Sequence, residues 1–400
     1  MVSPLKIAID GNEANVTHRV GSNVYAFEII KHMEALTRKA SNGHQIQVTV
    51  LLAEPAVKDL PKERPGWRYQ ILTPKKFWTQ WALPIHLFLH RNNYHVFFTP
   101  GHYAPRLSVV PYISSVMDVA FLEFPEQFKK NDLLQLTHWT KYSVTNAQKV
   151  IAISEATKQD IVAKYGKAAS DIVVAYPSVT LPSKEATSLK KAATLKKLGI
   201  QKPYVVYVGT LQPRKNIIKM VEAFESLKRS LASQDIRQKS KLKRQHHSEK
   251  LQLVVAGKIG WLADDTLQRI KESPFFSDIL LPGYVTEDVK QILLQEAEAS
   301  ILVGLYEGFG IPPLESMHLG TLPIVAHAMS LPEVVGKAGI LVDPLSHHSI
   351  ADGIKKALQL TAKGKAKYRR EMRKQVKKFS WEESAQKILG ALIEVGENKQ

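Results

Sequence analysis

The chain has 400 residues, of which 44% are hydrophobic and 23% are charged, and its formal net charge is +18. These values are typical of a globular protein, and the length predicts two domains because single cores stop growing near about 250–300 residues. The absence of cysteine excludes disulfides, a thiol nucleophile and a cysteine-ligated metal.

No apolar run reaches the ~20 residues that a membrane-spanning helix needs. A strand-like run begins at Leu5, so we expect no signal peptide and a cytoplasmic location. The basic charge leaves peripheral contact with the inner face of an anionic membrane open.

Short apolar runs alternate with longer amphipathic ones, which predicts an α/β protein with doubly wound parallel sheets. In the first half, strands are expected near 5–10, 46–52, 96–99, 110–115, 149–153 and 172–175, and helices near 22–37, 80–91, 131–147 and 155–165. In the second half, strands are expected near 204–208, 251–256, 278–281, 299–303 and 321–326, and helices near 216–230, 262–273 and 380–395.

The domain boundary is expected at a proline-containing stretch that shows no strand pattern. We therefore predict an N-terminal domain over 1–180, a linker over 181–203, a C-terminal domain over 204–378 and a final helix within 379–400. The polar, basic segment 230–250 is expected to be an inserted helix extension or loop.

Two local runs carry much of the positive charge. Residues 228–250 contain eight Lys or Arg against two acids, and residues 361–378 contain nine against one. Such runs attract nucleic acid, anionic lipid or an anionic substrate, or they only keep the protein in solution. Aromatic residues, which single-strand-binding surfaces place among the basic ones, are nearly absent from both runs, so we expect no nucleic-acid partner.

The most informative stretch is 306–316, which contains two glutamates eight residues apart, Glu307 and Glu315. An apolar run precedes it, two glycines follow Glu307, and two prolines precede Glu315, which predicts a strand, a glycine turn and a helix in succession. Carboxylates in this position accept hydrogen bonds from sugar hydroxyls, and the turn and the helix start offer N–H groups to a phosphate. The alternative is a solvated glutamate pair around an ordinary turn.

A second motif follows the first strand of the second half. Gly209 permits close backbone approach, and Arg214 and Lys215 come next at the carboxyl edge of the predicted sheet. Arginine grips phosphate with two donors and lysine adds a point charge, so this pair is suited to a diphosphate.

Together these two motifs resemble glycosyltransferase family 4. The resemblance implies the GT-B fold, in which two Rossmann-like domains face each other across a cleft and residues 379–400 cross back to the first domain. It implies retaining transfer of a hexose-type sugar from a GDP- or UDP-linked donor to a hydroxyl of a glycan or lipid-linked acceptor. No metal and no other cofactor is expected.

The resemblance also assigns roles to single residues. Arg214 and Lys215 would hold the donor diphosphate, Glu307 would contact the donor sugar, and Glu315 would bind the ribose. The remaining donor-binding positions implied by the family are Gly21, Gly209, Val285, Phe309, Gly310 and Ile311.

The chain departs from the family in its first half. Many relatives have His-Asp where this chain has Met117-Asp118, and methionine cannot donate a hydrogen bond. Asp118 is a candidate base on the acceptor side, or a cap of the next segment, and His102 is a further acceptor-side candidate. The departure keeps a catalytically silent sugar-nucleotide-binding protein as an alternative, beside an epimerase and a basic nucleic-acid-binding protein.

The segment 75–88 combines two lysines with two tryptophans and a phenylalanine pair. This pattern serves either a membrane-interface helix or a helix with one core face, and we favour the core.

Overall fold

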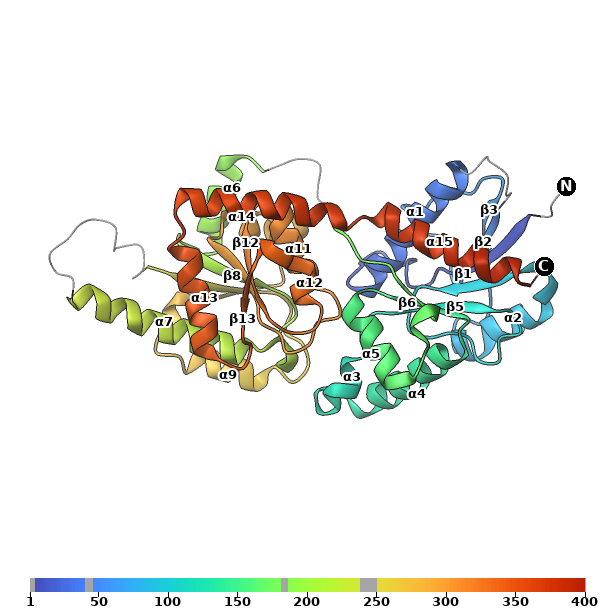
Figure 1. Ribbon diagram of the computed structural model, residues 1–400, viewed down its shortest axis with the longest axis horizontal. Coiled ribbons are helices and arrows are strands. Elements are labelled where there is room, and N and C mark those ends of the chain that lie inside the picture. Colours follow the sequence, from blue (N-terminus) through green and yellow to red (C-terminus); the bar gives the residue numbers. More distant parts are fainter. Residues whose placement is uncertain (1–3, 40–45, 181–185, 238–249, 400) are drawn as a thin grey trace. The chain divides into compact units, whose positions relative to one another are not determined.

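The computed structural model describes residues 4–39, 46–180, 186–237 and 250–399 (Figure 1). The chain forms two compact units. The first unit consists of Met1–Ser178 together with Phe379–Gln400, and the second of Val179–Lys378.

The first unit is built on a parallel sheet with the strand order β3-β2-β1-β4-β5-β6-β7. Its strands are β1 Leu5–Asp10, β2 Ile46–Leu52, β3 Trp67–Ile71, β4 Val96–Thr99, β5 Tyr112–Val116, β6 Lys149–Ala152 and β7 Ile172–Val174. The central strands are buried along almost their whole length, as expected for a parallel sheet that helices cover on both faces.

Helices flank this sheet on both faces. They are α1 Ser22–Lys39, α2 Leu83–Leu89, α3 Ala120–Glu123, α4 Lys130–Asn146, α5 Glu155–Tyr165 and α15 Trp381–Glu397. A π-helical turn, η1 Trp78–Ala82, runs directly into α2.

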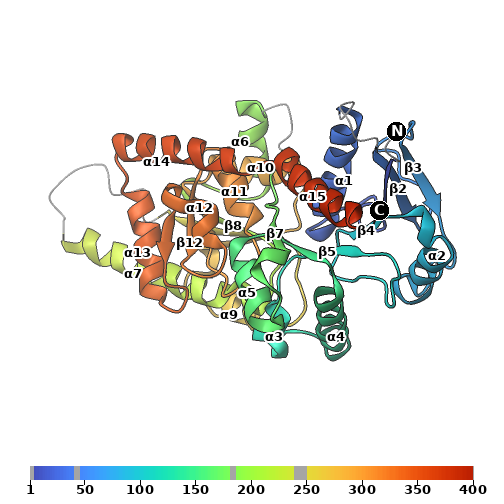
Figure 2. The ribbon, with the colours of Figure 1, turned by 45° about the vertical axis from the view of Figure 1, so that its right-hand side comes forward.

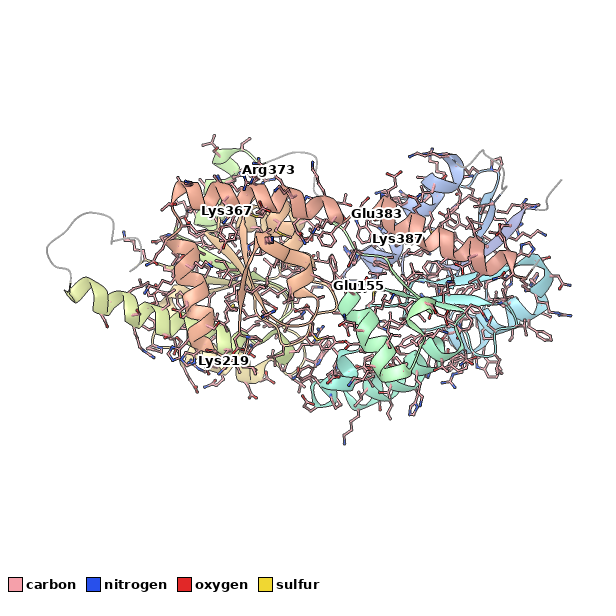
Figure 3. All side chains as sticks on the ribbon, viewed as in Figure 1. Glu155, Lys219, Lys367, Arg373, Glu383 and Lys387 are labelled. Carbon is pink, nitrogen blue, oxygen red and sulfur yellow. The ribbon has the colours of Figure 1, made fainter. Side chains whose placement is uncertain are left out.

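The C-terminal helix α15 lies beside α1, although the two are separated by most of the sequence (Figure 1, Figure 2). Trp381, at its first turn, is buried and packs edge-on against Tyr25 with ring centroids 5.9 Å apart. The Ser384 hydroxyl donates to the Tyr176 carbonyl over 2.6 Å. On the exposed side, Glu383 and Lys387 form an ion pair one turn apart (Figure 3).

The second unit has a parallel sheet with the order β10-β9-β8-β11-β12-β13. Its strands are β8 Tyr204–Val208, β9 Gln252–Ala256, β10 Ile279–Gly283, β11 Ala299–Leu302, β12 Leu322–Ala326 and β13 Ile340–Val342. Its helices are α6 Ser188–Lys197, α7 Ile217–Arg237, α9 Asp264–Lys271, α10 Glu287–Glu296, α11 Ile311–His318, α12 Leu331–Val335, α13 His347–Leu358 and α14 Ala362–Gln375.

Several elements lie outside the sequence-based expectations. The edge strand β3 alternates apolar and polar residues, Trp-Arg-Tyr-Gln-Ile, which is a strand signal that the expected ranges do not include. The basic helix α14 has few apolar residues and so carries no pattern that marks a buried element. The stretch 181–203, expected as a linker, contains α6, whose Leu195 packs into the core of the second unit. Of the basic segment 230–250, residues up to Arg237 continue α7, and 238–249 lie outside the described residues.

Candidate active site

The two sequence motifs of the second unit meet at one edge of its sheet. Strands β8 and β11 are hydrogen-bonded neighbours, and their carboxyl ends lead into the loops that carry Lys215 and Glu307. Because parallel neighbours end at the same edge, residues 92 positions apart in sequence come into contact there.

Lys215 and Glu307 form a close ion pair in this loop cluster. The Lys215 ammonium lies 2.7 and 2.8 Å from the two carboxylate oxygens of Glu307. Their side chains are only 14% and 9% exposed, so the pair is largely shielded from water. A methyl group at Gly304 would come within 2.8 Å of Glu307 Oε1, so glycine at this position makes room for the carboxylate.

Arg214 is fixed to the same loop by its backbone and its side chain. The Leu305 N–H donates to the Arg214 carbonyl over 2.8 Å, and Arg214 Nη1 donates to the Tyr306 carbonyl over 3.2 Å. The Nε–H of Arg214 is buried and has no hydrogen-bond partner among the residues that the structure describes. Since a guanidinium has five donors, Arg214 keeps donors for an anion while its position stays fixed.

The glycine turn between the two glutamates is held by a buried serine. Gly310 has φ 108°, a conformation that favours glycine, and a methyl group there would come within 2.7 Å of Leu331. The Ser330 hydroxyl lies 2.7 and 2.8 Å from the carbonyl oxygens of Glu307 and Phe309. The backbone conformation of this turn is therefore fixed by the Ser330 hydrogen bonds and by the glycine at position 310.

The start of α11 corrects one sequence-based expectation. Ile311 is the first helical residue, and the two prolines that follow it have no N–H. The Leu314 N–H donates back to the Gly310 carbonyl. The first turn of the helix thus supplies few donors, and donors for a phosphate would have to come from the backbone around Phe309 to Ile311.

Glu315 lies at the start of the second turn of α11 and is paired with Lys290 of α10. The Lys290 ammonium is 2.7 Å from Glu315 Oε1 and 2.7 Å from Glu287 Oε2. Burial raises the pKa of Glu315, and Lys290 partly offsets this rise. Burial by itself would lower the pKa of Lys290, but the two carboxylates outweigh it and raise that pKa.

Two of the other expected donor-binding positions, Gly209 and Val285, lie near the loop that carries Gly257. Gly209 and Gly257 follow β8 and β9, and a methyl group on Gly257 would lie 1.8 Å from the Gly209 carbonyl oxygen. The Gly257 N–H donates to the Gly283 carbonyl, two residues before Val285. Lys258 lies 4.8 Å from the ring centre of Tyr284, which is exposed.

In the first unit, Gly21 precedes α1 with φ 52° and has open space around it. Nearby Arg19 is already engaged, since it bonds Asp59 over 2.9 Å and the Ala14 carbonyl over 2.9 Å. Asp10, at the end of β1, is buried and accepts from Trp78 Nε1 over 3.1 Å. Burial raises the Asp10 pKa to about 6.

His102 lies against the loop that carries Met117 and Asp118. The Met117 N–H donates to His102 Nε2 over 3.4 Å, so His102 Nε2 is an acceptor and the proton lies on Nδ1. Within the described part of the chain this buried Nδ1 has no hydrogen-bond partner. Burial lowers the pKa of His102, and Asp118 partly offsets this effect. Asp118 Oδ1 accepts from the Ala120 N–H over 3.1 Å, which is a helix-capping contact. Ser154 likewise caps α5.

Three residues that the motif analysis did not single out support the site in the second unit. Lys290 and Ser330 hold the two glutamates and their turn, and Gly304 makes room for Glu307. The partnerships of Lys290 and Ser330 depend on contacts between segments that are separate in sequence, so no local motif indicates them.

The described residues contain neither a metal-binding cluster nor a membrane-spanning helix. In the parts of the chain that the structure describes, no three or more His, Asp or Glu side chains gather as a metal would need. Over the same residues, no helix is both long and apolar enough to cross a membrane.

Comparison with known families identifies both halves of the chain. Residues 190–379 match the family described as Glycosyl transferases group 1, and residues 21–181 match Glycosyltransferase Family 4. This chain belongs to glycosyltransferase family 4. Enzymes of this kind transfer a sugar from a nucleotide-sugar donor, and that activity is the general function of this protein.

Individual relatives and solved structures agree with this assignment. The chain is 26% identical over 335 residues to the O-antigen chain mannosyltransferase B of Escherichia coli, covering 81% of this chain and 78% of that protein. The fold is similar to Anabaena Alr3699/HepE in complex with UDP and glucose, with TM-score 0.68, 16% identity, and 98% and 99% of the two chains covered. A sucrose-phosphate synthase from Thermosynechococcus elongatus gives TM-score 0.66 at 17% identity, covering 96% and 97%. The two parallel sheets are those of the GT-B fold.

Proposed function

We propose that this enzyme transfers a hexose, with mannose as the first candidate, from a nucleoside diphosphate to a hydroxyl of a growing glycan or lipid-linked acceptor, with retention of configuration. The observation that carries the proposal is the pairing of Lys215 with Glu307 beside Arg214 at one sheet edge. Mannose is favoured because the Escherichia coli relative is named an O-antigen chain mannosyltransferase, and the match covers 78% of that relative.

The chemistry proposed for this edge is stabilisation of the leaving group. When the bond between the anomeric carbon and the phosphate oxygen breaks, negative charge accumulates on the departing diphosphate. Arg214 and Lys215 supply two cations there, already positioned by hydrogen bonds, so little reorganisation accompanies the reaction. We propose that these cations take the place of a metal ion in neutralising that charge.

The glutamates are proposed to orient the donor. Glu307 would accept hydrogen bonds from the sugar hydroxyls, and Glu315 from the ribose hydroxyls. Both carboxylates are buried and held by lysines, which keeps each in a fixed position. Retention is inferred from the family resemblance alone, and no side chain of the site is assigned as a covalent nucleophile.

The base of the donor nucleotide is the first question for experiment. The structurally similar Anabaena Alr3699/HepE was solved with UDP, whereas the Escherichia coli relative is named a mannosyltransferase. Both a GDP-linked and a UDP-linked donor sugar therefore remain in the proposal. We propose to measure thermal stabilisation of the full chain by UDP, GDP, ADP and their sugar conjugates. A ligand at 100 times its Kd adds about 2.7 kcal/mol to the unfolding free energy, or roughly 5–11 °C for a unit of this size.

A matched pair of variants makes this test specific. Arg214→Ala should lose the response to the nucleotide, whereas Arg229→Ala, on the exposed surface of α7, should keep it. No response of the folded wild-type protein to any nucleotide would refute the donor site.

Transfer itself needs a second assay. The stabilising sugar nucleotide should yield a product with short glycan acceptors, and NMR of the new linkage should show the same anomeric configuration as the donor. Nucleotide binding without transfer or donor hydrolysis would instead support the silent alternative that Met117 raised.

A further inference from the structure

The segment η1–α2 of the first unit presents apolar side chains on two opposite faces. One face, with Ala82, Leu83, His86 and Leu87, is buried in the unit. The other face consists of Phe77, Trp81, Ile85, Phe88 and Leu89, which are between 50% and 66% exposed. The core face that we favoured for this segment is therefore present, and the opposite face carries exposed apolar residues as well.

The exposed residues form one continuous stripe. They follow one another at intervals of four, four, three and one, which is the spacing of a single helical face. Leu107 adds to this surface from another loop, since the Arg106 N–H donates to the Thr79 carbonyl of η1 over 3.4 Å and Leu107 is 84% exposed. In both views α2 lies at the periphery of the first unit (Figure 1, Figure 2).

The charges around this stripe have one sign. Lys75 and Lys76 precede Phe77, and Arg91 follows Leu89. Between Glu63 and Asp118 the sequence contains six Lys or Arg and no acidic residue. Among the described residues, Glu54 pairs with Lys75 over 2.7 Å on the exposed surface, and Arg64, farther from the stripe in sequence, pairs with Glu34.

From these observations we infer that the face formed by Phe77, Trp81, Ile85, Phe88 and Leu89 docks on an anionic lipid bilayer. Aromatic and aliphatic side chains on one side of a helix enter the boundary between headgroups and acyl chains, while flanking lysine and arginine contact lipid phosphates. A second copy of this chain is a poorer occupant, because two such faces would bring cations of the same sign together. The inference concerns where the enzyme works and stands apart from the donor chemistry.

The test uses the full chain and vesicles of two compositions, phosphatidylcholine alone and phosphatidylcholine with about one third phosphatidylglycerol. Co-sedimentation should show binding to the anionic vesicles that is at least about tenfold stronger than to the neutral ones. Phe77→Ser with Phe88→Ser should weaken that binding by at least about tenfold, since two aromatic rings no longer enter the bilayer. The control Leu189→Ser removes an apolar residue that is even more exposed, at 84%, beside lysines on α6 and should bind like the wild type.

A charge-reversal pair separates this surface from general attraction by the net charge. Lys76→Glu with Arg91→Glu should weaken vesicle binding about tenfold. Lys367→Glu with Arg373→Glu makes the same change in net charge on α14 of the second unit and should have less than about a twofold effect (Figure 3). Equal losses in both pairs would overturn the inference, because overall charge would then explain the binding.

Two further results would also overturn it. One is no binding of the wild type to either vesicle, and the other is a dimer in sedimentation velocity that disappears in the Phe77 and Phe88 variant. Each variant should keep the nucleotide-induced rise in melting temperature, because none of these residues is at the candidate donor site. Loss of vesicle binding with an intact nucleotide response therefore tests the docking face separately from the proposed transfer function.

Discussion

The Lys215→Met substitution removes the cation that faces Glu307 and keeps most of the apolar volume of the side chain. It leaves a carboxylate that is 9% exposed without the ammonium that lies 2.7 and 2.8 Å from its oxygens. Breaking a buried ion pair by removing one partner costs about 3–5 kcal/mol. For a unit of this size, that loss lowers the melting temperature by about 6–20 °C.

The second unit contains a matched control on α7. Lys219 and Glu222 form an ion pair with the same 2.7 Å separation, but both side chains are 31% exposed (Figure 3). Because solvent screens such a pair, Lys219→Met should cost less than about 1 kcal/mol. The two ion pairs have the same separation and differ in their exposure to solvent, so the comparison of the two variants tests the effect of burial.

Urea unfolding of the two variants and of a rescue variant provides the measurement. Lys215→Met combined with Glu307→Gln should regain most of the lost stability, because no buried charge remains unpaired. All variants that lack Lys215 should still lose nucleotide-induced stabilisation. A loss for Lys215→Met no larger than that for Lys219→Met would refute the buried pair as described.

Three further predictions follow from contacts elsewhere in the chain. Gly257→Ala places a methyl group 1.8 Å from a backbone oxygen and should reduce the unfolding free energy by at least about 3 kcal/mol, whereas Gly390→Ala, which meets nothing within 4 Å in α15, should raise it by about 0.5–1 kcal/mol in urea unfolding. Lys290→Met removes the cation that opposes the raised pKa of Glu315, so the Glu315 carboxylate should become protonated at a higher pH than in the wild type. Nucleotide-induced stabilisation, measured as the pH falls from 8 to 5, should therefore be lost at a higher pH in the variant, and an unchanged pH profile would contradict the proposed role of Glu315. The Asp10 pKa is raised from 3.8 to about 6 in the folded state, so the folded protein binds the extra proton and the wild type should lose up to about 3 kcal/mol relative to Asp10→Asn as the pH rises from 4 to above 6; a constant difference across that range would show that Asp10 is not desolvated.

The strands of the second unit show how much of the fold the sequence predicts. The ranges expected for β8, β9 and β12 agree with the structure within one residue, because fully buried parallel strands are short, continuous apolar runs. In the first unit, the alternation Trp-Arg-Tyr-Gln-Ile of β3 is a strand signal that the expected ranges do not include. The pattern carries no such signal for α14, which has few apolar residues and forms where the rest of the second unit offers it a surface.

The candidate site divides in the same way. The order of strand, glycine turn and acid placed Lys215 and Glu307 at one sheet edge, since parallel strands share their carboxyl ends. Their direct ion pair was not predicted, and neither was the pair between Lys290 and Glu315, because each depends on side-chain distances between separate segments. The effect of the two prolines on the donors of α11 was readable from the sequence and was overlooked in favour of the general rule for helix starts.

The sequence by itself determined the family, the two parallel-sheet units and the positions of the paired glutamates and cations, since local apolar patterns and short motifs carry that information. Only the tertiary structure decided which charges are paired, which glycines have no space for a side chain, and which face of η1–α2 is exposed. These properties depend on distance and burial, and both are set by segments that meet only when the chain folds.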